Sequence, residues 1–215
     1  MDFNPLDLIL HLDVYLDMLV TNYGTWVYAI LFLVIFCETG LVVMPFLPGD
    51  SLLFIAGAVA AGGAMDPLLL GGLLMLAAIL GDSTNYLIGR TAGEKLFSNP
   101  NSKIFRRDYL QQTHDFYDKH GGKTVTLARF LPIIRTFAPF VAGVGKMPYA
   151  RFFGFSVLGT VLWVGGLVTL GFFFGNVPFI KQNLSLLVVG IILVSLLPMV
   201  ISLVRSKMGQ RASKA

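Results

Sequence analysis

The feature that most constrains this chain is a series of apolar runs about as long as a bilayer is thick. Phe152–Phe174 and Leu184–Leu203 contain no charged residue. Because a segment inside lipid must satisfy its backbone hydrogen bonds internally, a run of about 20 apolar residues predicts a transmembrane helix. The runs therefore predict an all-α, polytopic membrane protein.

The composition argues against a water-soluble domain. Hydrophobic residues make up 55% of the 215 residues, charged residues make up 13%, and the mean hydropathy is +0.75. The remaining polar residues are too few to cover a surface that faces water. The basic residues lie beside apolar runs and in no DNA-binding motif, so we expect no nucleic-acid partner. The single cysteine, Cys37, excludes an internal disulfide, and we expect neither a metal nor a cofactor.

Two further runs are long enough to cross but carry acidic residues. Trp26–Met44 contains Glu38, and Leu68–Gly89 contains Asp82. Together with the two uncharged runs they predict about four full transmembrane helices. Asn85 and Tyr86 follow Asp82 at three- and four-residue spacing, and we expect the three on one helix face.

The two ends of the chain differ from this membrane domain, residues 25–204. Residues 1–24 place aspartates between apolar positions and predict an amphipathic helix in the membrane interface. Residues 205–215 form a basic tail, and residues 90–123 form a basic loop between apolar runs. The positive-inside rule places this loop and this tail in the cytoplasm.

Two segments are apolar but too short or too broken to cross, so we expect re-entrant hairpins. Residues 45–64 begin with two prolines and continue for only 14 apolar residues, and residues 124–145 are broken by Pro132 and Pro139. A full crossing at 124–145 would place the basic loop and tail on opposite sides of the membrane. We therefore expect this hairpin to enter from the cytoplasm, the first from outside, and both termini to be cytoplasmic.

Opposed hairpins, each followed by a full span, would form an inverted repeat, and glycines show its trace. At an offset of 82 residues, four glycines of the first half fall on four of the second: Gly63, Gly72, Gly89 and Gly93 on Gly145, Gly154, Gly171 and Gly175.

Five charged residues lie at or near membrane depth: Glu38, Asp50, Asp82, Arg129 and Arg135. Each costs about 2.5 to 3.5 kcal/mol to insert at mid-bilayer. One interpretation is that they are buried ion pairs that fix the packing. Because apolar residues would usually hold a bundle as well, we favour a second interpretation for the arginines, in which they bind an anion.

The spacing of the two arginines supports an anion site. On one unbroken helix, Arg129 and Arg135 would point roughly 120° apart. Pro132 breaks that helix, so an unwound hairpin tip would let both guanidinium groups converge, with backbone N–H groups nearby. A phosphate matches the two-pronged donors of arginine.

Several short motifs together resemble the DedA family of bacterial inner-membrane proteins, which belongs to the VTT-domain or SNARE-associated group. They are Glu38, "FLPGD" with Pro48, Gly49 and Asp50, "GD" ending at Asp82, "YLIGR" from Tyr86 to Arg90, and "RFLPIIRT" from Arg129 through Pro132 to Thr136. The likeness covers nearly the whole chain.

The resemblance implies both a fold and a function. It implies two opposed re-entrant hairpins, and it implies that the residues matching Glu38, Asp50, Arg129 and Arg135 are needed for activity. It also implies a multi-pass protein of the bacterial inner membrane that returns the lipid carrier undecaprenyl phosphate across that membrane, driven by the proton motive force. We read Asp82, Asn85, Tyr86, Arg90, Pro48, Gly49, Pro132 and Thr136 as supporting residues.

We therefore predict a transporter and not an enzyme. Its substrate is expected to be undecaprenyl phosphate or a related phospholipid, with Glu38 and Asp50 exchanging protons; sodium stays open as the coupling ion, and so does a homo-oligomer. Alternatives are a proton-coupled exporter of small solutes or cations, an intramembrane aspartyl-type hydrolase using Asp50 and Asp82, and a purely structural partner of envelope proteins.

Overall fold

A computed structural model describes residue 18 and residues 22–41, 49–96 and 121–177. Within these ranges every regular element is a helix, which confirms the predicted all-α class. The predicted amphipathic helix lies largely outside the described residues. Most of the basic loop also lies outside them, and so do the whole apolar run 184–203 and the whole tail.

The helices follow in chain order with these bounds: α3 Trp26–Gly40, α4 Gly49–Ala61, α5 Pro67–Leu96, α7 Lys123–Ala128, α8 Pro132–Val144, α9 Tyr149–Thr160, the π-helix η1 Val161–Gly165, and α10 Gly166–Gly175.

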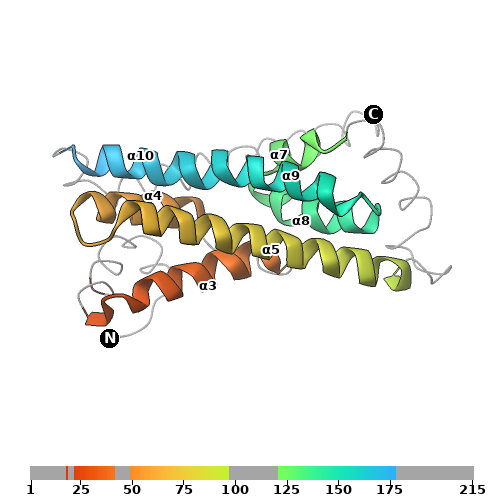
Figure 1. Ribbon diagram of the computed structural model, residues 1–215, viewed down its shortest axis with the longest axis horizontal. Helices are drawn as coiled ribbons and strands as arrows, with labels where there is room; N and C mark the ends of the chain where they lie inside the picture. Colours follow the sequence, from red (N-terminus) through yellow and green to blue (C-terminus); the bar gives the residue numbers. More distant parts are fainter. Residues whose placement is uncertain (1–17, 19–21, 42–48, 97–120, 178–215) are drawn as a thin grey trace, which may run out of the picture.

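Two long rods form the frame of the fold. One is α5, and the other is the continuous run of α9, η1 and α10; they lie antiparallel in Figure 1. Both contain a stretch long and apolar enough to cross a membrane, Pro67–Ala92 with 26 residues and Tyr149–Gly175 with 27. Both were predicted as spans. The first helix continues past its predicted end at Gly89, so Arg90 lies inside a helix and does not begin a loop.

The start of α5 shows how the sequence sets a boundary. The Asp66 carboxylate accepts hydrogen bonds from the backbone N–H groups of Leu68 and Leu69, at 2.9 and 2.8 Å. The next residue, Pro67, has no N–H to leave unsatisfied and suits the first helical position. The turn after α4 is therefore fixed at this point.

The remaining described helices are shorter. α4 and α8 each have 13 residues, about 20 Å at the α-helical rise, which is less than the hydrocarbon thickness. They lie toward opposite ends of the long axis in Figure 1. α3 has 15 residues and does not cross as predicted for Trp26–Met44. It starts beside the start of α5, where Tyr28 Oη accepts from the Asp66 N–H, and it ends at Gly40 against Gly81 in the middle of α5. α8 begins at Pro132 as expected, but it continues through Pro139, which we expected to break it.

The two short helices pack on the long rods through equivalent contacts. A Cβ at Gly57 of α4 would clash with the carbonyl of Val168 on α10. In the same way, a Cβ at Gly143 of α8 would clash with the carbonyl of Tyr86 on α5. Val168 follows Tyr86 by 82 residues, the offset found in the glycine pattern.

A second pair of contacts repeats the arrangement. Gly171 approaches the backbone of Phe54 on α4, and Gly89 approaches the backbone of Phe140 on α8. Gly89 and Gly171 are partners in the predicted repeat. This glycine pair therefore marks two equivalent helix crossings, each of which needs a residue without a side chain. Gly72 and Gly154, another pair of the predicted repeat, have nothing within 4 Å of a Cβ and take no part in them.

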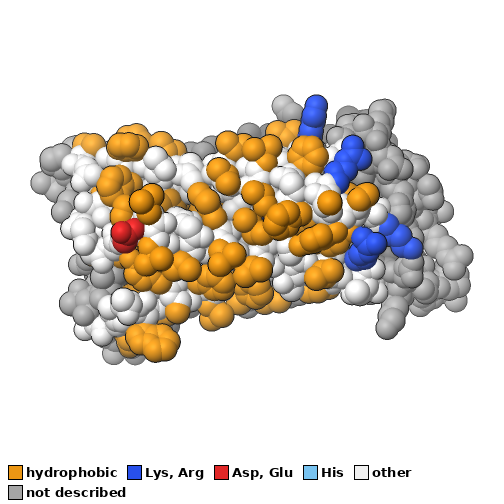
Figure 2. Space-filling view, viewed as in Figure 1, with side chains coloured by type: hydrophobic (Ala, Val, Ile, Leu, Met, Phe, Trp, Pro, Cys, Tyr) orange, Lys and Arg blue, Asp and Glu red, His pale blue; other side chains and the backbone are white. Residues whose placement is uncertain are grey.

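The surface separates charge from apolar area along the long axis. Figure 2 shows apolar side chains over most of the described part of this face, Lys and Arg side chains at one end, and one small acidic patch toward the other. Asp66 precedes α5 while the exposed Arg90 lies near its far end; at 1.5 Å per residue this separates them by about 36 Å. An apolar belt between charged ends is the surface of a membrane protein.

Candidate functional site

The five charged residues at membrane depth converge on the middle of the fold from five different segments. Four of them, Glu38, Asp82, Arg129 and Arg135, are buried, and Asp50 is partly buried. Glu38 lies near the end of α3 and Asp50 near the start of α4. Asp82 lies midway along α5, and the arginines flank the start of α8. The site is built where the short helices meet the long rods.

Arg135 lies between two carboxylates. Its Nη2 contacts Glu38 Oε1, and its Nη1 donates to Asp50 Oδ1 at 2.5 Å. The indole Nε1 of Trp163 donates to the same Asp50 oxygen at 2.8 Å. The guanidinium therefore joins the end of α3 to the start of α4, and Trp163 adds the second long rod.

Gly49 makes room for this arrangement. A Cβ at Gly49 would overlap the carboxyl group of Glu38. The Glu38 carboxylate thus lies against the first residue of α4, where the helix dipole favours a negative charge. This contact gives a physical reason for glycine in the "FLPGD" motif.

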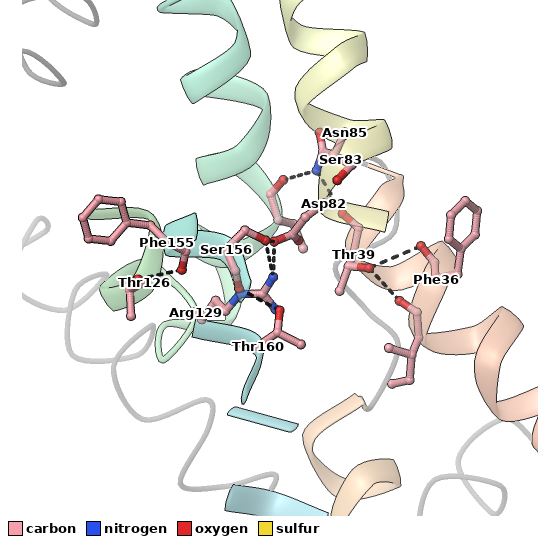
Figure 3. Close-up of polar contacts among 12 residues, drawn as sticks. Phe36, Thr39, Asp82, Ser83, Asn85, Thr126, Arg129, Phe155, Ser156 and Thr160 are labelled. Carbon is pink, nitrogen blue, oxygen red and sulfur yellow. Dashed lines mark hydrogen bonds and ion pairs between the residues drawn. The ribbon is translucent and has the colours of Figure 1, made fainter. Parts of the chain in front are cut away.

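Arg129 forms a second cluster with Asp82 and Ser156 (Figure 3). Its Nη2 contacts Asp82 Oδ2 and donates to Ser156 Oγ at 3.2 Å, and Ser156 Oγ donates to the same Asp82 oxygen at 2.6 Å. Gly159 lets the arginine side chain pass, since a Cβ there would lie 2.8 Å from Arg129 Cδ. The cluster ties the segment after α7 to both long rods.

An interruption of the helix between α7 and α8 brings the two arginines together. α7 ends at Ala128, Leu131 is extended with φ −116° and ψ 107°, and α8 begins at Pro132. The guanidinium carbon of Arg135 lies 4.7 Å from the centre of the Trp163 ring, and that of Arg129 lies 5.8 Å from it. Both side chains therefore reach one indole, as an unwound hairpin tip would allow.

The charges of the site do not balance. When all five groups are ionised, three carboxylates face two guanidinium groups, an excess of one negative charge. Among the described residues, the Nε atoms of both arginines and Glu38 Oε2 have no hydrogen-bond partner. The site therefore keeps unused donors as well as an acceptor. Within the same ranges, no group of three or more His, Cys, Asp or Glu could hold a metal.

The predicted supporting residues fall into separate places. Asn85 donates to the carbonyls of Thr39 and Thr136, at 3.1 and 2.7 Å, and so links α3 and α8 beside the charged groups. Tyr86 instead donates to the Met147 carbonyl and accepts from Arg90 at 2.6 Å.

Tyr86 and Arg90 therefore hold the turn between α8 and α9, and neither joins the charged clusters. Pro48 lies outside the described residues. Pro132 takes part through its position at the start of α8.

Sequence reasoning missed Trp163 and Ser156. Both lie in the uncharged run Phe152–Phe174, which we read only as a span. Two tryptophans occur in the chain, but nothing local marks Trp163 as a partner of charges. Its place in a π-helix, a form that often occurs at functional sites, was also not visible in the sequence.

A comparison with protein families matches a VTT domain to residues 47–173, which is more than half of the chain and includes four of the five charged residues. This chain belongs to the DedA family of VTT-domain proteins. Glu38 lies just before the matched region.

Similarity to individual proteins supports the same assignment. Protein DedA of Escherichia coli K12 is 61% identical over 204 residues, covering 94% of this chain and 93% of the relative. The uncharacterized membrane protein Rv0364 of Mycobacterium tuberculosis H37Rv is 43% identical, covering 85% and 81%. The inner membrane protein YqjA of E. coli K12 is 35% identical, covering 86% and 87%. No solved structure matches the chain.

Proposed function

We propose that this protein is a flippase of the bacterial cytoplasmic membrane that carries a lipid phosphate, undecaprenyl phosphate or a related phospholipid, together with protons. The observation that supports this most is the buried cluster of two arginines and three carboxylates between the two short helices. Ionisable groups at membrane depth mark transport pathways in polytopic proteins.

In the proposed topology, α4 and α8 are re-entrant and enter from opposite faces. Both are too short to cross, they lie at opposite ends of the fold, and they pack on the rods through equivalent crossings. The exposed basic residues Arg90, Lys123, Lys146 and Arg151 mark the cytoplasmic end. The described N-terminal residues do not lie on that side, because Tyr28 Oη accepts a hydrogen bond from the backbone N–H of Asp66 at the opposite end. The predicted cytoplasmic N-terminus therefore does not fit the start of α3.

The charge count suggests how protons and anion are coupled. With every carboxylate ionised, an arriving phosphate would add negative charge to a site that already has an excess of it. A proton on Glu38 or Asp50 weakens that group's hold on Arg135, which then offers its donors to a phosphate. Anion and proton therefore enter and leave together.

The lipid tail does not have to enter the site. Phe130, Ile134 and Phe137 are 55%, 49% and 41% exposed, although each lies within two residues of a buried arginine. The hairpin thus presents an apolar face outward and its guanidinium groups inward. A phosphate headgroup inside, with its hydrocarbon chain against this face, fits that arrangement.

The test is the binding of farnesyl phosphate, a short polyprenyl phosphate, to the purified protein. Arg129→Lys and Arg135→Lys keep the charge but lose the two-pronged contact of a guanidinium. Each is expected to weaken binding about ten- to hundredfold, the equivalent of about 1.5 to 3 kcal/mol. Wild-type affinity in both folded variants would mean that the arginines only neutralise their acids.

A proton-coupled exporter of small solutes or cations is the second candidate. The excess of one carboxylate over guanidinium groups favours it, since a cation would balance the site. Proteoliposomes separate the two: the flippase moves labelled lipid phosphate along with protons, and the exporter moves a cation against them. In either case, Glu38→Gln and Asp50→Asn are expected to abolish the dependence on the proton gradient.

An aspartyl-type hydrolase has less support. Its two catalytic carboxylates would need to share a proton and activate water. Here Asp50 is bound by Arg135 and Asp82 by Arg129.

A further inference from the structure

Trp163 contacts three of the five charged residues at the centre of the fold. Its side chain is 4% exposed. The indole N–H donates to Asp50 Oδ1 at 2.8 Å, while Arg135 and Arg129 lie over the ring at 4.7 and 5.8 Å from its centre. One side chain therefore touches both guanidinium groups and the carboxylate that holds one of them.

Stacking determines which part of an arginine stays available. A guanidinium that lies over an aromatic ring uses its face for the cation–π contact, so its N–H donors point outward in its own plane. The Nε donors of Arg129 and Arg135 are buried and, among the described residues, have no partner. The indole thus lies against two arginines whose Nε donors stay available for an oxyanion.

We propose that Trp163 is a positioning residue for the anionic headgroup, an inference that rests on the proposed function. When protons on the carboxylates weaken their hold on Arg135, the indole still stacks on both guanidinium groups and keeps their donors directed at the phosphate. Without the indole, the side chains of Arg129 and Arg135 would lose conformational entropy each time a headgroup binds, which would weaken binding.

A packing role alone does not account for these contacts. A phenylalanine fills a buried site without a polar atom, whereas the indole N–H of Trp163 shares Asp50 Oδ1 with Arg135. The residue also lies in the π-helix Val161–Gly165, whose wider turn interrupts an otherwise α-helical rod at this level. Trp163 therefore links a proposed proton carrier to the proposed anion site.

The chain contains two tryptophans, which provides a matched control. Trp26 is 72% exposed and lies on α3, away from the charged clusters. We compare Trp26→Phe, Trp163→Phe and Trp163→Leu as purified, folded proteins. The ligand is farnesyl phosphate, and uncharged farnesol reports on the hydrocarbon chain alone.

Trp163→Phe keeps a weaker cation–π surface and is expected to raise the Kd for farnesyl phosphate roughly tenfold. Trp163→Leu removes the surface and is expected to raise it further. Farnesol binding stays unchanged in both, and Trp26→Phe behaves as wild type. This order, with an effect confined to the charged ligand, distinguishes positioning from a loss of packing.

Two results would overturn the inference, and they are distinguishable. Wild-type affinity for farnesyl phosphate in folded Trp163→Phe removes the role of Trp163 but leaves the flippase in place. Absence of saturable binding to the wild-type protein removes the proposed function and this inference together. If Trp163→Phe does not fold, the Trp26→Phe protein provides the test, because Trp163 is then its one tryptophan. Its fluorescence emission must change on saturation with farnesyl phosphate. A constant spectrum refutes the role of Trp163 at the headgroup.

Discussion

Replacement of Gly49 by alanine tests the tightest contact of the site with a single methyl group. The new Cβ would overlap the carboxyl group of Glu38, which is only 1% exposed and is paired with Arg135. Gly49 has no positive φ, so its backbone accepts alanine without strain. The whole effect must therefore come from displacement of Glu38.

The expected cost follows from what the carboxylate would lose. Forcing a methyl group into a packed interior costs about 1 to 3 kcal/mol, and removing one partner of a buried ion pair costs about 3 to 5 kcal/mol. Because Asp50 still holds Arg135, we expect a value near the overlap of these ranges. Gly49→Ala should lower the free energy of unfolding by about 3 kcal/mol.

Gly72 supplies the matched control. It lies in the interior of α5, is exposed, and has nothing within 4 Å of a Cβ. Gly72→Ala should therefore raise the free energy of unfolding by about 0.5 to 1 kcal/mol. Both variants are unfolded in the same detergent by a graded denaturant, and headgroup binding is measured on the folded protein.

A double-mutant cycle attributes the effect to Glu38. In a Glu38→Ala background the carboxyl group is absent, so Gly49→Ala should become nearly neutral, a coupling of about 3 kcal/mol. The reasoning is refuted if Gly49→Ala is as mild as Gly72→Ala, or if its cost is unchanged in the Glu38→Ala protein. Either result would mean that Glu38 is not packed against the start of α4.

Three further predictions concern the second cluster, the helix crossings and the topology. Ser156→Ala removes the hydrogen bonds that Ser156 makes with Arg129 and with the buried carboxylate of Asp82. It should lower the free energy of unfolding by about 1 to 3 kcal/mol in the same assay. Gly143→Ala places a methyl group against the backbone of α5 and should cost about 1 to 3 kcal/mol, whereas a neutral result would contradict the crossing. In a Cys37→Ala background, an impermeant thiol reagent should label Asp66→Cys but not Lys123→Cys in intact cells; the reverse pattern would invert the orientation.

Local patterns were enough to predict the helices. Backbone hydrogen bonding and hydropathy act over a few residues, so the apolar runs gave both long rods, and Pro132 gave the break before α8. The errors were at boundaries that packing decides and in α3, which was predicted to cross but ends halfway along α5. α5 extends to Leu96, and α8 tolerates Pro139 within its length.

The sequence by itself determined that five costly charges lie within an apolar, all-helical chain and that two of them are arginines on either side of a proline. Only the tertiary structure decided their partners. Arg135 meets acids 97 and 85 residues away, and Arg129 meets one 47 residues away. It also brought Trp163 between them, because glycines allow the short helices to pack closely against the long rods. Such pairings depend on the distance between helix backbones, which no local pattern of residues specifies.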